Sequence, residues 1–257
     1  MMLRALVALM LLFLLAPLIV VLLTSFSDDP ILTFPPAHWG FGGYRAVFAN
    51  EGFARGLRVS LMLAGSATAV SLMLGTASAL ALARGRFAGR AFLVAFFTAP
   101  LLLPAIVLGL GLLLVLAQVG LLATLPGLLL GHCLVTLPFV IRVVMTALGG
   151  IAPELEEAAS VLGASPVRVF VRVTLPLMLP GLVAAASLAF LASFDEVVLS
   201  LFLVGPRITT LPIEVYHAVQ YRSGPDISAL SMLLILFTAA LVVVVERSLG
   251  FVRAIGR

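Results

Sequence analysis

The sequence predicts an all-α membrane protein of six transmembrane helices, from its composition, its long uncharged runs and the polar segments that separate them. The chain has 257 residues, of which 63% are hydrophobic and 10% are charged, and its mean hydropathy is +1.27. A soluble globular domain is about 45–50% apolar and about 25% charged. One core of this size cannot bury the excess, so most apolar surface must face lipid. The long apolar runs also argue against an outer-membrane barrel, which has short alternating segments.

Six segments are apolar for long enough to span a bilayer, which takes about 20 residues. They are residues 5–23, 59–83, two segments within 91–141 that meet near 118–127, 182–203 and 227–245. Arg4 before the first segment is also typical of a signal peptide, but the segment's length and the lack of a cleavage site favour an uncleaved helix. We therefore expect a first helix with its connector in residues 1–55, a core of five helices in 56–249 and a tail in 250–257.

The basic residues indicate an orientation and exclude two kinds of site. All 15 are arginine, and without lysine the chain can hold neither a standard P-loop nor a lysine Schiff base. With the N-terminus inside, the inner segments hold Arg4, Arg84, Arg86, Arg90, Arg142, Arg168, Arg172, Arg247, Arg253 and Arg257, and the outer segments hold Arg45, Arg55, Arg58, Arg207 and Arg222. This bias places both termini in the cytoplasm. The net charge of +4 therefore indicates topology and not nucleic-acid binding.

Cysteine and histidine usage gives no sign of a metal or cofactor site. Cys133 is the single cysteine, and its apolar surroundings predict a small packing residue. His38 and His132 have no second ligand at metal-binding spacing. A membrane-embedded enzyme is therefore a disfavoured alternative, although residues distant in sequence can still meet in the fold.

Residues 153–181 are the most polar long segment in this apolar chain. They predict two short helices joined by a turn, which we call the elbow. Pro153 suits the first position of a helix, and the glutamates after it favour the positive end of the helix dipole. Gly163 is typical of a helix C-terminus, and Ser165 with Pro166 begins the second helix. The first arm carries Glu154, Glu156 and Glu157, and the second carries Arg168 and Arg172 before Pro176 and Pro180.

The elbow lies on the predicted cytoplasmic side, where it can contact a soluble partner. Its apolar residues recur at helical spacing and form a small face: Leu155, Ala158, Ala159 and Leu162. Such a face fits a groove on another protein, and the charges beside it fix the register of docking. An ordinary solvated loop helix is the alternative interpretation of the same residues.

The elbow resembles the EAA loop of ABC importer permeases. The residues E-A-A at 157–159 are followed by Gly163 and later by Leu175–Pro176, with Val173 at the apolar position of the family pattern. The resemblance covers roughly residues 56–249 and implies the type I (MetI-like) permease fold, with a coupling loop at 150–181. The residues that it implies for coupling to an ATPase are Glu154, Glu157, Ala158, Ala159, Gly163, Arg168 and Pro176.

The same resemblance implies partners and a location. Such a permease pairs with a second, similar permease subunit, binds two cytoplasmic ATPase subunits and receives its cargo from a periplasmic binding protein. Its location is the bacterial inner membrane, with the connector in the periplasm. The chain is then expected to be a non-catalytic transport subunit, which agrees with its lack of lysine.

Residues 193–206, followed by T-L-P at 210–212, are similar to the permeases of spermidine and putrescine importers. The same branch contains permeases for other solutes, so a different small solute is an alternative cargo. An ion-coupled secondary transporter is a further alternative, in which intramembrane carboxylates bind the coupling ion. The elbow, and the absence of visible repeat symmetry in the sequence, argue against it.

Asp195 and Glu196 interrupt the apolar run 182–203 and are candidates for the substrate pathway. Carboxylates within a membrane helix usually face a cavity or a partner, and a polyamine is a cation. Adjacent residues on a helix point about 100° apart, so only one carboxylate is expected to face the pathway. Phe194 and Tyr221 offer aromatic faces for an ammonium group. The alternative is a structural salt bridge, to Arg207, to Arg222 or to a partner permease.

Overall fold

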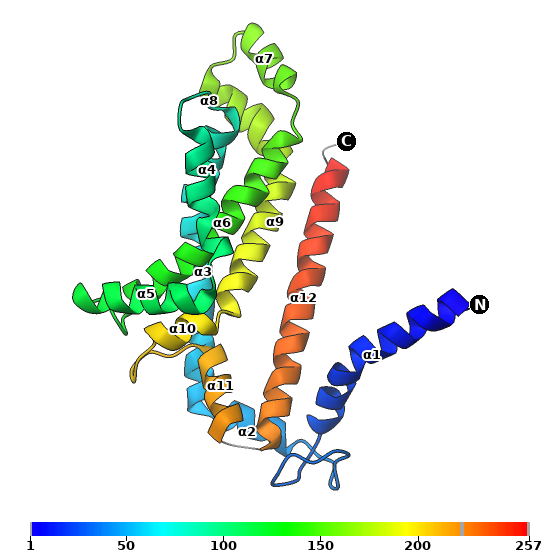
Figure 1. Ribbon diagram of the computed structural model, residues 1–257. Coiled ribbons are helices and arrows are strands. Elements are labelled where there is room, and N and C mark those ends of the chain that lie inside the picture. The colour runs from blue at the N-terminus through cyan, green and yellow to red at the C-terminus, as the bar shows by residue number, and fades with distance from the viewer. Residues whose placement is uncertain (1, 222–223, 256–257) are drawn as a thin grey trace. The chain divides into compact units, whose positions relative to one another are not determined.

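A computed structural model describes residues 2–221 and 224–255 as an all-helical protein (Figure 1). Within these residues the only strand-like pairs are two isolated bridges, Ser27 with Trp39 and Gly205 with Ile208. The helices are α1 Met2–Thr24, α2 Gly42–Ala49, α3 Glu51–Arg84, α4 Arg90–Thr98, the 3₁₀ turn η1 Ala99–Leu102, α5 Ala105–Gln118, α6 Leu125–Gly149, α7 Pro153–Val161, α8 Pro166–Val169, the π turn η2 Phe170–Thr174, α9 Leu175–Phe194, α10 Val198–Leu203, α11 Leu211–Tyr221 and α12 Pro225–Ile255.

The chain divides into two compact units. The first contains Met1–Leu57 and Ile213–Leu241, and the second contains Arg58–Pro212 and Val242–Arg257. Helices α3, α11 and α12 contribute residues to both units. The functional division into residues 1–55, 56–249 and 250–257 stays a prediction.

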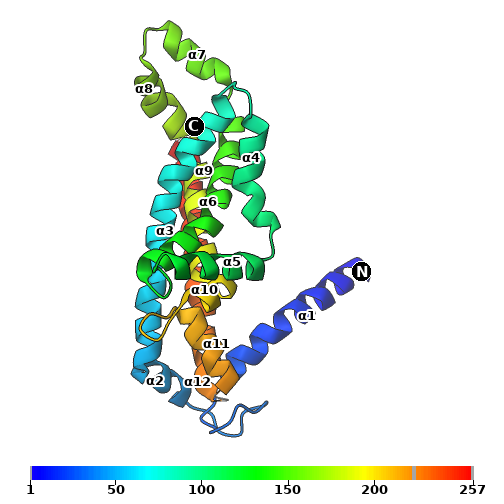
Figure 2. The same ribbon diagram turned by 60° about the vertical axis from the view of Figure 1, so that its left-hand side comes forward.

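The second unit is built around helices α3, α6 and α9, which run alongside one another (Figure 2). Small residues allow this close approach, because a side chain at Gly181 of α9 would place its Cβ 2.3 Å from that of Ala147 on α6. A Cβ at Gly75 of α3 would likewise lie 2.7 Å from Val140. Membrane helices lack a hydrophobic drive towards one another and depend on such close packing.

The count of six straight spans is not confirmed, because the third is broken and the described apolar part of the first, Leu9–Thr24, is shorter than a span. Among the described residues, four helices are long and apolar enough to cross a membrane: Glu51–Arg84, Leu125–Gly149, Pro166–Phe194 and Pro225–Arg247. A fifth span arises only if Arg90–Leu102 and Ala105–Gln118 count together, although they are bent by 102°. Pro104 causes this break, since its ring forces Leu103 into an extended conformation, with ψ of 141°.

The predicted span 182–203 is wrong at both ends. The observed apolar span is Pro166–Phe194, so the second arm of the elbow is the start of a membrane helix. Pro176 and Pro180 do not end it. The wider π turn Phe170–Thr174 precedes Pro176, where the proline ring would otherwise crowd the carbonyl one turn earlier. Asp195 and Glu196 lie beyond the end of α9 and therefore do not share a helix.

In the first unit, the Asp29 carboxylate organises the connector between α1 and α2. Its Oδ2 accepts hydrogen bonds from the Ala37 N–H at 2.8 Å and from the hydroxyls of Ser27 and Thr33 at 3.2 Å. Its Oδ1 accepts from the His38 N–H at 3.1 Å and lies 2.8 Å from Nδ1 of the same histidine. These contacts, the His38 side chain foremost, lower the pKa of Asp29 to about 2.

We expect the connector to keep its structure at neutral pH and to lose it in strong acid. The pKa of Asp29 is lower in the folded state than its ordinary value of 3.8, so its contribution to stability is complete above pH 4 and disappears as the pH falls towards 2. Trp39, the single tryptophan, pairs with Ser27 in this connector, and its fluorescence should report the transition. Asp29→Asn should remove the transition, and an unchanged acid transition in that variant would contradict the assignment.

Candidate functional site: the elbow and the break after α9

The first arm of the elbow is helix α7, which lies at one end of the second unit beside α8 (Figures 1 and 2). Gly163 ends it as the sequence predicts, with a left-handed φ of 84°. The Gly163 N–H donates to the Ser160 carbonyl at 3.0 Å, and the Ala164 N–H donates to the Ala159 carbonyl at 3.1 Å. This pair of bonds is the Schellman arrangement, which satisfies carbonyls that the helix leaves open. Ser165 stands at the start of α8 but makes no capping bond with its side chain.

The coupling residues suggested by the sequence lie on or beside an open surface. Glu154, Glu157 and Ala158 on α7 are exposed, and Ala159 is half-buried. Exposed residues on the far side of the turn are Arg168 and Pro176. The tip of the elbow is strongly apolar, since Val161 is 87% and Leu162 is 88% exposed. An exposed apolar tip with carboxylates beside it is typical of a docking element.

Glu156 joins the two arms of the elbow to the end of α3, a role that the sequence analysis missed. Its Oε2 lies 3.0 Å from Nε of Arg84, and its Oε1 accepts a hydrogen bond from the Thr174 hydroxyl at 2.7 Å. Arg84 also donates from Nη2 to the Ile151 carbonyl at 3.3 Å, directly before α7. We call these four residues the clamp. Glu156 stands between two other glutamates in sequence, and no local pattern distinguishes it from them.

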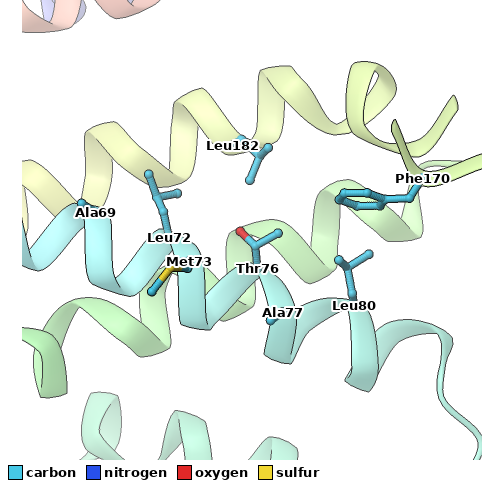
Figure 3. A pocket seen from close by; sticks show the side chains of 8 residues that line it. All are labelled: Ala69, Leu72, Met73, Thr76, Ala77, Leu80, Phe170 and Leu182. Atoms are coloured by element: carbon cyan, nitrogen blue, oxygen red, sulfur yellow. The ribbon is translucent and has the colours of Figure 1, made fainter. Parts of the chain in front are cut away.

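Two cavities lie in this part of the second unit, and one of them is lined by clamp residues. A groove of about 950 Å³ lies between the first arm and the α3–α4 loop. The side chains that line it include Arg84, Arg86, Arg90, Pro153, Glu156, Glu157, Ser160 and Val161. An apolar pocket of about 530 Å³ lies between α3 and the span Pro166–Phe194. Figure 3 shows Phe170, from the π turn, and Leu182 pointing towards α3 in this pocket.

The clamp and Phe170 together connect the elbow to the membrane helices. Glu156 fixes α7 to Thr174, at the end of the π turn, and Phe170 packs beside Leu80 of α3. The span Pro166–Phe194 continues from the elbow without a break. A force on α7 therefore has a direct route to both α3 and α9.

We expect Glu156→Ala to loosen the elbow without unfolding the unit. Losing a hydrogen bond to a charged group removes about 1.5–3 kcal/mol, and Arg84 loses its ion-pair partner. Hydrogen–deuterium exchange of the α7 amides should accelerate by about tenfold or more. Glu154→Ala is the matched control, because it removes an exposed carboxylate from the same helix. Equal exchange in the two variants would show that the clamp does not hold α7.

The break after α9 separates the two carboxylates by role. Glu196 is half-buried, and its Oε1 accepts from the Leu199 N–H at 2.8 Å, which caps α10. Asp195 is exposed, and among the described residues neither carboxylate forms an ion pair with Arg207. Arg222 lies outside the described residues. Asp195 is therefore the more exposed of the two carboxylates, and its place in the substrate pathway stays a prediction.

The two aromatic candidates are not equivalent. Phe194 is 6% exposed and stacks on Phe190 with ring centroids 5.9 Å apart, so it packs inside the unit. Tyr221 is 76% exposed at the end of α11, in the first unit. Its ring centroid lies 6.2 Å from that of His217. Within the described residues, no three histidine, cysteine or carboxylate side chains gather into a metal site.

Comparisons with known proteins agree on one family. Residues 71–253 match the model for "Binding-protein-dependent transport system inner membrane component". The chain is 33% identical over 230 residues to the putrescine transport system permease protein PotI of Escherichia coli, covering 87% of this chain and 82% of that protein. It is 31% identical over 228 residues to the spermidine/putrescine transport system permease protein PotC of Haemophilus influenzae, covering 88% of each.

Solved structures share the fold at lower identity. A bacterial ABC transporter involved in the import of the acidic polysaccharide alginate has a chain that matches with a TM-score of 0.73 at 19% identity, covering 95% of this chain and 94% of that one. The MetNI methionine ABC transporter, in an inward-facing conformation, matches with a TM-score of 0.62 at 21% identity, covering 78% of this chain and 95% of that one. Both likenesses indicate the MetI-like permease fold.

Proposed function

The chain belongs to the family of binding-protein-dependent transport system inner membrane components, and from this premise we propose that its cargo is a polyamine such as putrescine. The proposal is supported by identities of 30–33% to putrescine and spermidine permeases over most of the chain. Within the structure, the proposal depends on one observation. Asp195 is exposed, whereas the neighbouring Glu196 already accepts a hydrogen bond from the Leu199 N–H. A free carboxylate attracts the ammonium group of a polyamine, most strongly where water is partly excluded.

The proposed assembly contains this chain, a second similar permease subunit, two ATPase subunits and a periplasmic binding protein. The chain itself would be a non-catalytic transport subunit. It has no lysine for a standard P-loop, so ATP would be hydrolysed on a partner chain. The arginine distribution supports an inner-membrane orientation with both termini and the elbow in the cytoplasm. The exposed tip of α7, with Leu162 at its end, is the surface that would enter the ATPase.

In the proposed mechanism, closure of the ATPases displaces α7. The clamp passes this displacement to Thr174 and α3, and the continuous span Pro166–Phe194 carries it to the far end of α9. Asp195 lies directly beyond that end. Movement at the elbow would therefore change the surroundings of the carboxylate and release the cargo inwards.

Reconstitution of the purified assembly in lipid vesicles tests the proposal. Putrescine-loaded binding protein should stimulate ATP hydrolysis and drive putrescine into the vesicles. Omitting the ATPase should stop uptake, whereas uptake driven by an ion gradient alone would identify a secondary transporter. ATP hydrolysis without any movement of putrescine or spermidine would reject the polyamine and point to another small solute.

A further inference from the structure

A buried histidine connects the two sides of the break that contains Asp195. His132 on α6 is 1% exposed. Its Nδ1 lies 2.8 Å from the Ser193 hydroxyl on α9, and its Nε2 lies 3.1 Å from the Ser200 hydroxyl on α10. A neutral imidazole has one N–H donor and one acceptor nitrogen, so one serine accepts a hydrogen bond and the other donates one. A single side chain thus holds both ends of the break.

The position of α10 against α6 depends on this part of α6. Gly131 precedes His132, and a Cβ there would lie 2.6 Å from Leu203 and 2.8 Å from Leu199. The missing side chain lets α10 approach closely, while the histidine supplies the polar contact at the same place. Since α10 is only six residues long, it has little helical stability of its own and relies on these contacts.

Further hydroxyls extend the contact to α3. The Thr136 hydroxyl donates to the His132 carbonyl at 2.9 Å and lies 2.7 Å from the Ser71 hydroxyl. Ser71, Thr136, Ser193 and Ser200 are all buried. Polar groups in an apolar interior are costly without partners, so the satisfied network favours one arrangement of the four helices.

We infer that His132 is a positioning residue of the substrate pathway, which fixes the α9–α10 break so that Asp195 stays exposed while Glu196 caps α10. This inference rests on the proposed function, because Asp195 is taken as the group that meets the cargo. His132 acts through Ser193 and Ser200 and does not contact the cargo itself. The elbow lies at the other end of the span Pro166–Phe194, so ATPase docking should not depend on His132.

Serine variants test this inference in the complete assembly. Ser200→Ala removes one contact of the imidazole, and putrescine delivered per ATP hydrolysed should fall by about fivefold, with stimulated ATP hydrolysis retained. Ser187→Ala is the control, because that hydroxyl on α9 donates to the Val183 carbonyl of its own helix at 2.7 Å. A parallel loss of hydrolysis and delivery in Ser200→Ala would reduce His132 to a general structural role.

Two substitutions of His132 distinguish its contact with Ser200 from its contact with Ser193. The amide of His132→Gln reaches the position of Nε2 and keeps the contact with Ser200, whereas that of His132→Asn reaches only the position of Nδ1. The glutamine variant should therefore retain more delivery per ATP than the asparagine variant. If the asparagine variant delivers as much putrescine per ATP as the glutamine variant, or more, then His132 does not act through its contact with Ser200 on α10.

A cargo-free measurement separates this inference from the proposed function. In a Cys133→Ala background, Asp195→Cys should react readily with a water-soluble, positively charged thiol reagent. Adding Ser200→Ala should slow that reaction by about threefold or more, and adding Ser187→Ala should not. Unchanged labelling in the Ser200→Ala protein would overturn the inference. If the unaltered assembly moves no putrescine, only the cargo proposal fails, and the labelling still decides the role of His132.

Discussion

Glu157→Lys is expected to abolish transport by preventing the ATPase from engaging the elbow. Glu157 is exposed on α7, beside the apolar tip that we propose enters the ATPase. Reversing a charge at an interface places like charges together at a cost of several kcal/mol, which corresponds to about a 100-fold or greater loss of affinity. Putrescine uptake and stimulated ATP hydrolysis should both disappear, and the ATPase should no longer co-purify with the permease.

The matched control is Glu246→Lys, which makes the same charge reversal at an exposed position on α12. It should leave co-purification and uptake close to those of the unaltered protein. Retained ATPase binding in Glu157→Lys with normal uptake would show that α7 is an ordinary solvated helix. The interpretation of the elbow as a coupling element would then be wrong.

Asp195→Asn is expected to separate ATP hydrolysis from cargo movement. The substitution keeps the size of the side chain but removes the charge that we propose meets the ammonium group. Hydrogen bonds to charged groups contribute about 1.5–3 kcal/mol, so putrescine delivered per ATP hydrolysed should fall by about tenfold or more. Hydrolysis stimulated by the loaded binding protein should persist, because the elbow is unchanged. This pattern differs from that expected for Glu157→Lys, in which uptake and stimulated hydrolysis are lost together.

Glu196→Gln provides the comparison within the same break. An amide oxygen can still accept the Leu199 N–H that now meets Oε1 at 2.8 Å, so we expect delivery per ATP close to that of the unaltered protein. If Glu196→Gln impairs delivery and Asp195→Asn does not, the two carboxylates have the reverse roles. Normal delivery in both variants would move the cargo site away from the break.

Much of the elbow could be predicted from sequence because its signals are local. Pro153 begins α7 and Gly163 ends it, and both positions depend on the backbone properties of those residues alone. The second arm was predicted less well. The next apolar span was predicted to start only at residue 182, yet the helix runs through both prolines, because a π turn precedes Pro176 and Pro180 lies within α9.

The sequence by itself determined the membrane class, the approximate place of most apolar helices and the position of the elbow. These follow from composition, periodicity and single-residue backbone preferences, which act over a few residues. It also identified Asp195 and Glu196 as unusual, since charge within an apolar run is visible in the sequence. It placed both on one helix and so could not distinguish them.

Only the tertiary structure decided which of these side chains have a partner within the fold and which remain exposed to a ligand. Glu156 meets Arg84, and His132 meets Ser200, across separations of 72 and 68 residues. Such contacts depend on how α3, α6, α9 and α10 pack, and no local pattern encodes a partner so far along the chain. The bend before α5 differs, since it follows from the local effect of Pro104 on Leu103. The break after α9 has the same origin as these contacts, because His132 on α6 contacts Ser193 and Ser200 on its two sides. The free carboxylate of Asp195 is a consequence of that packing.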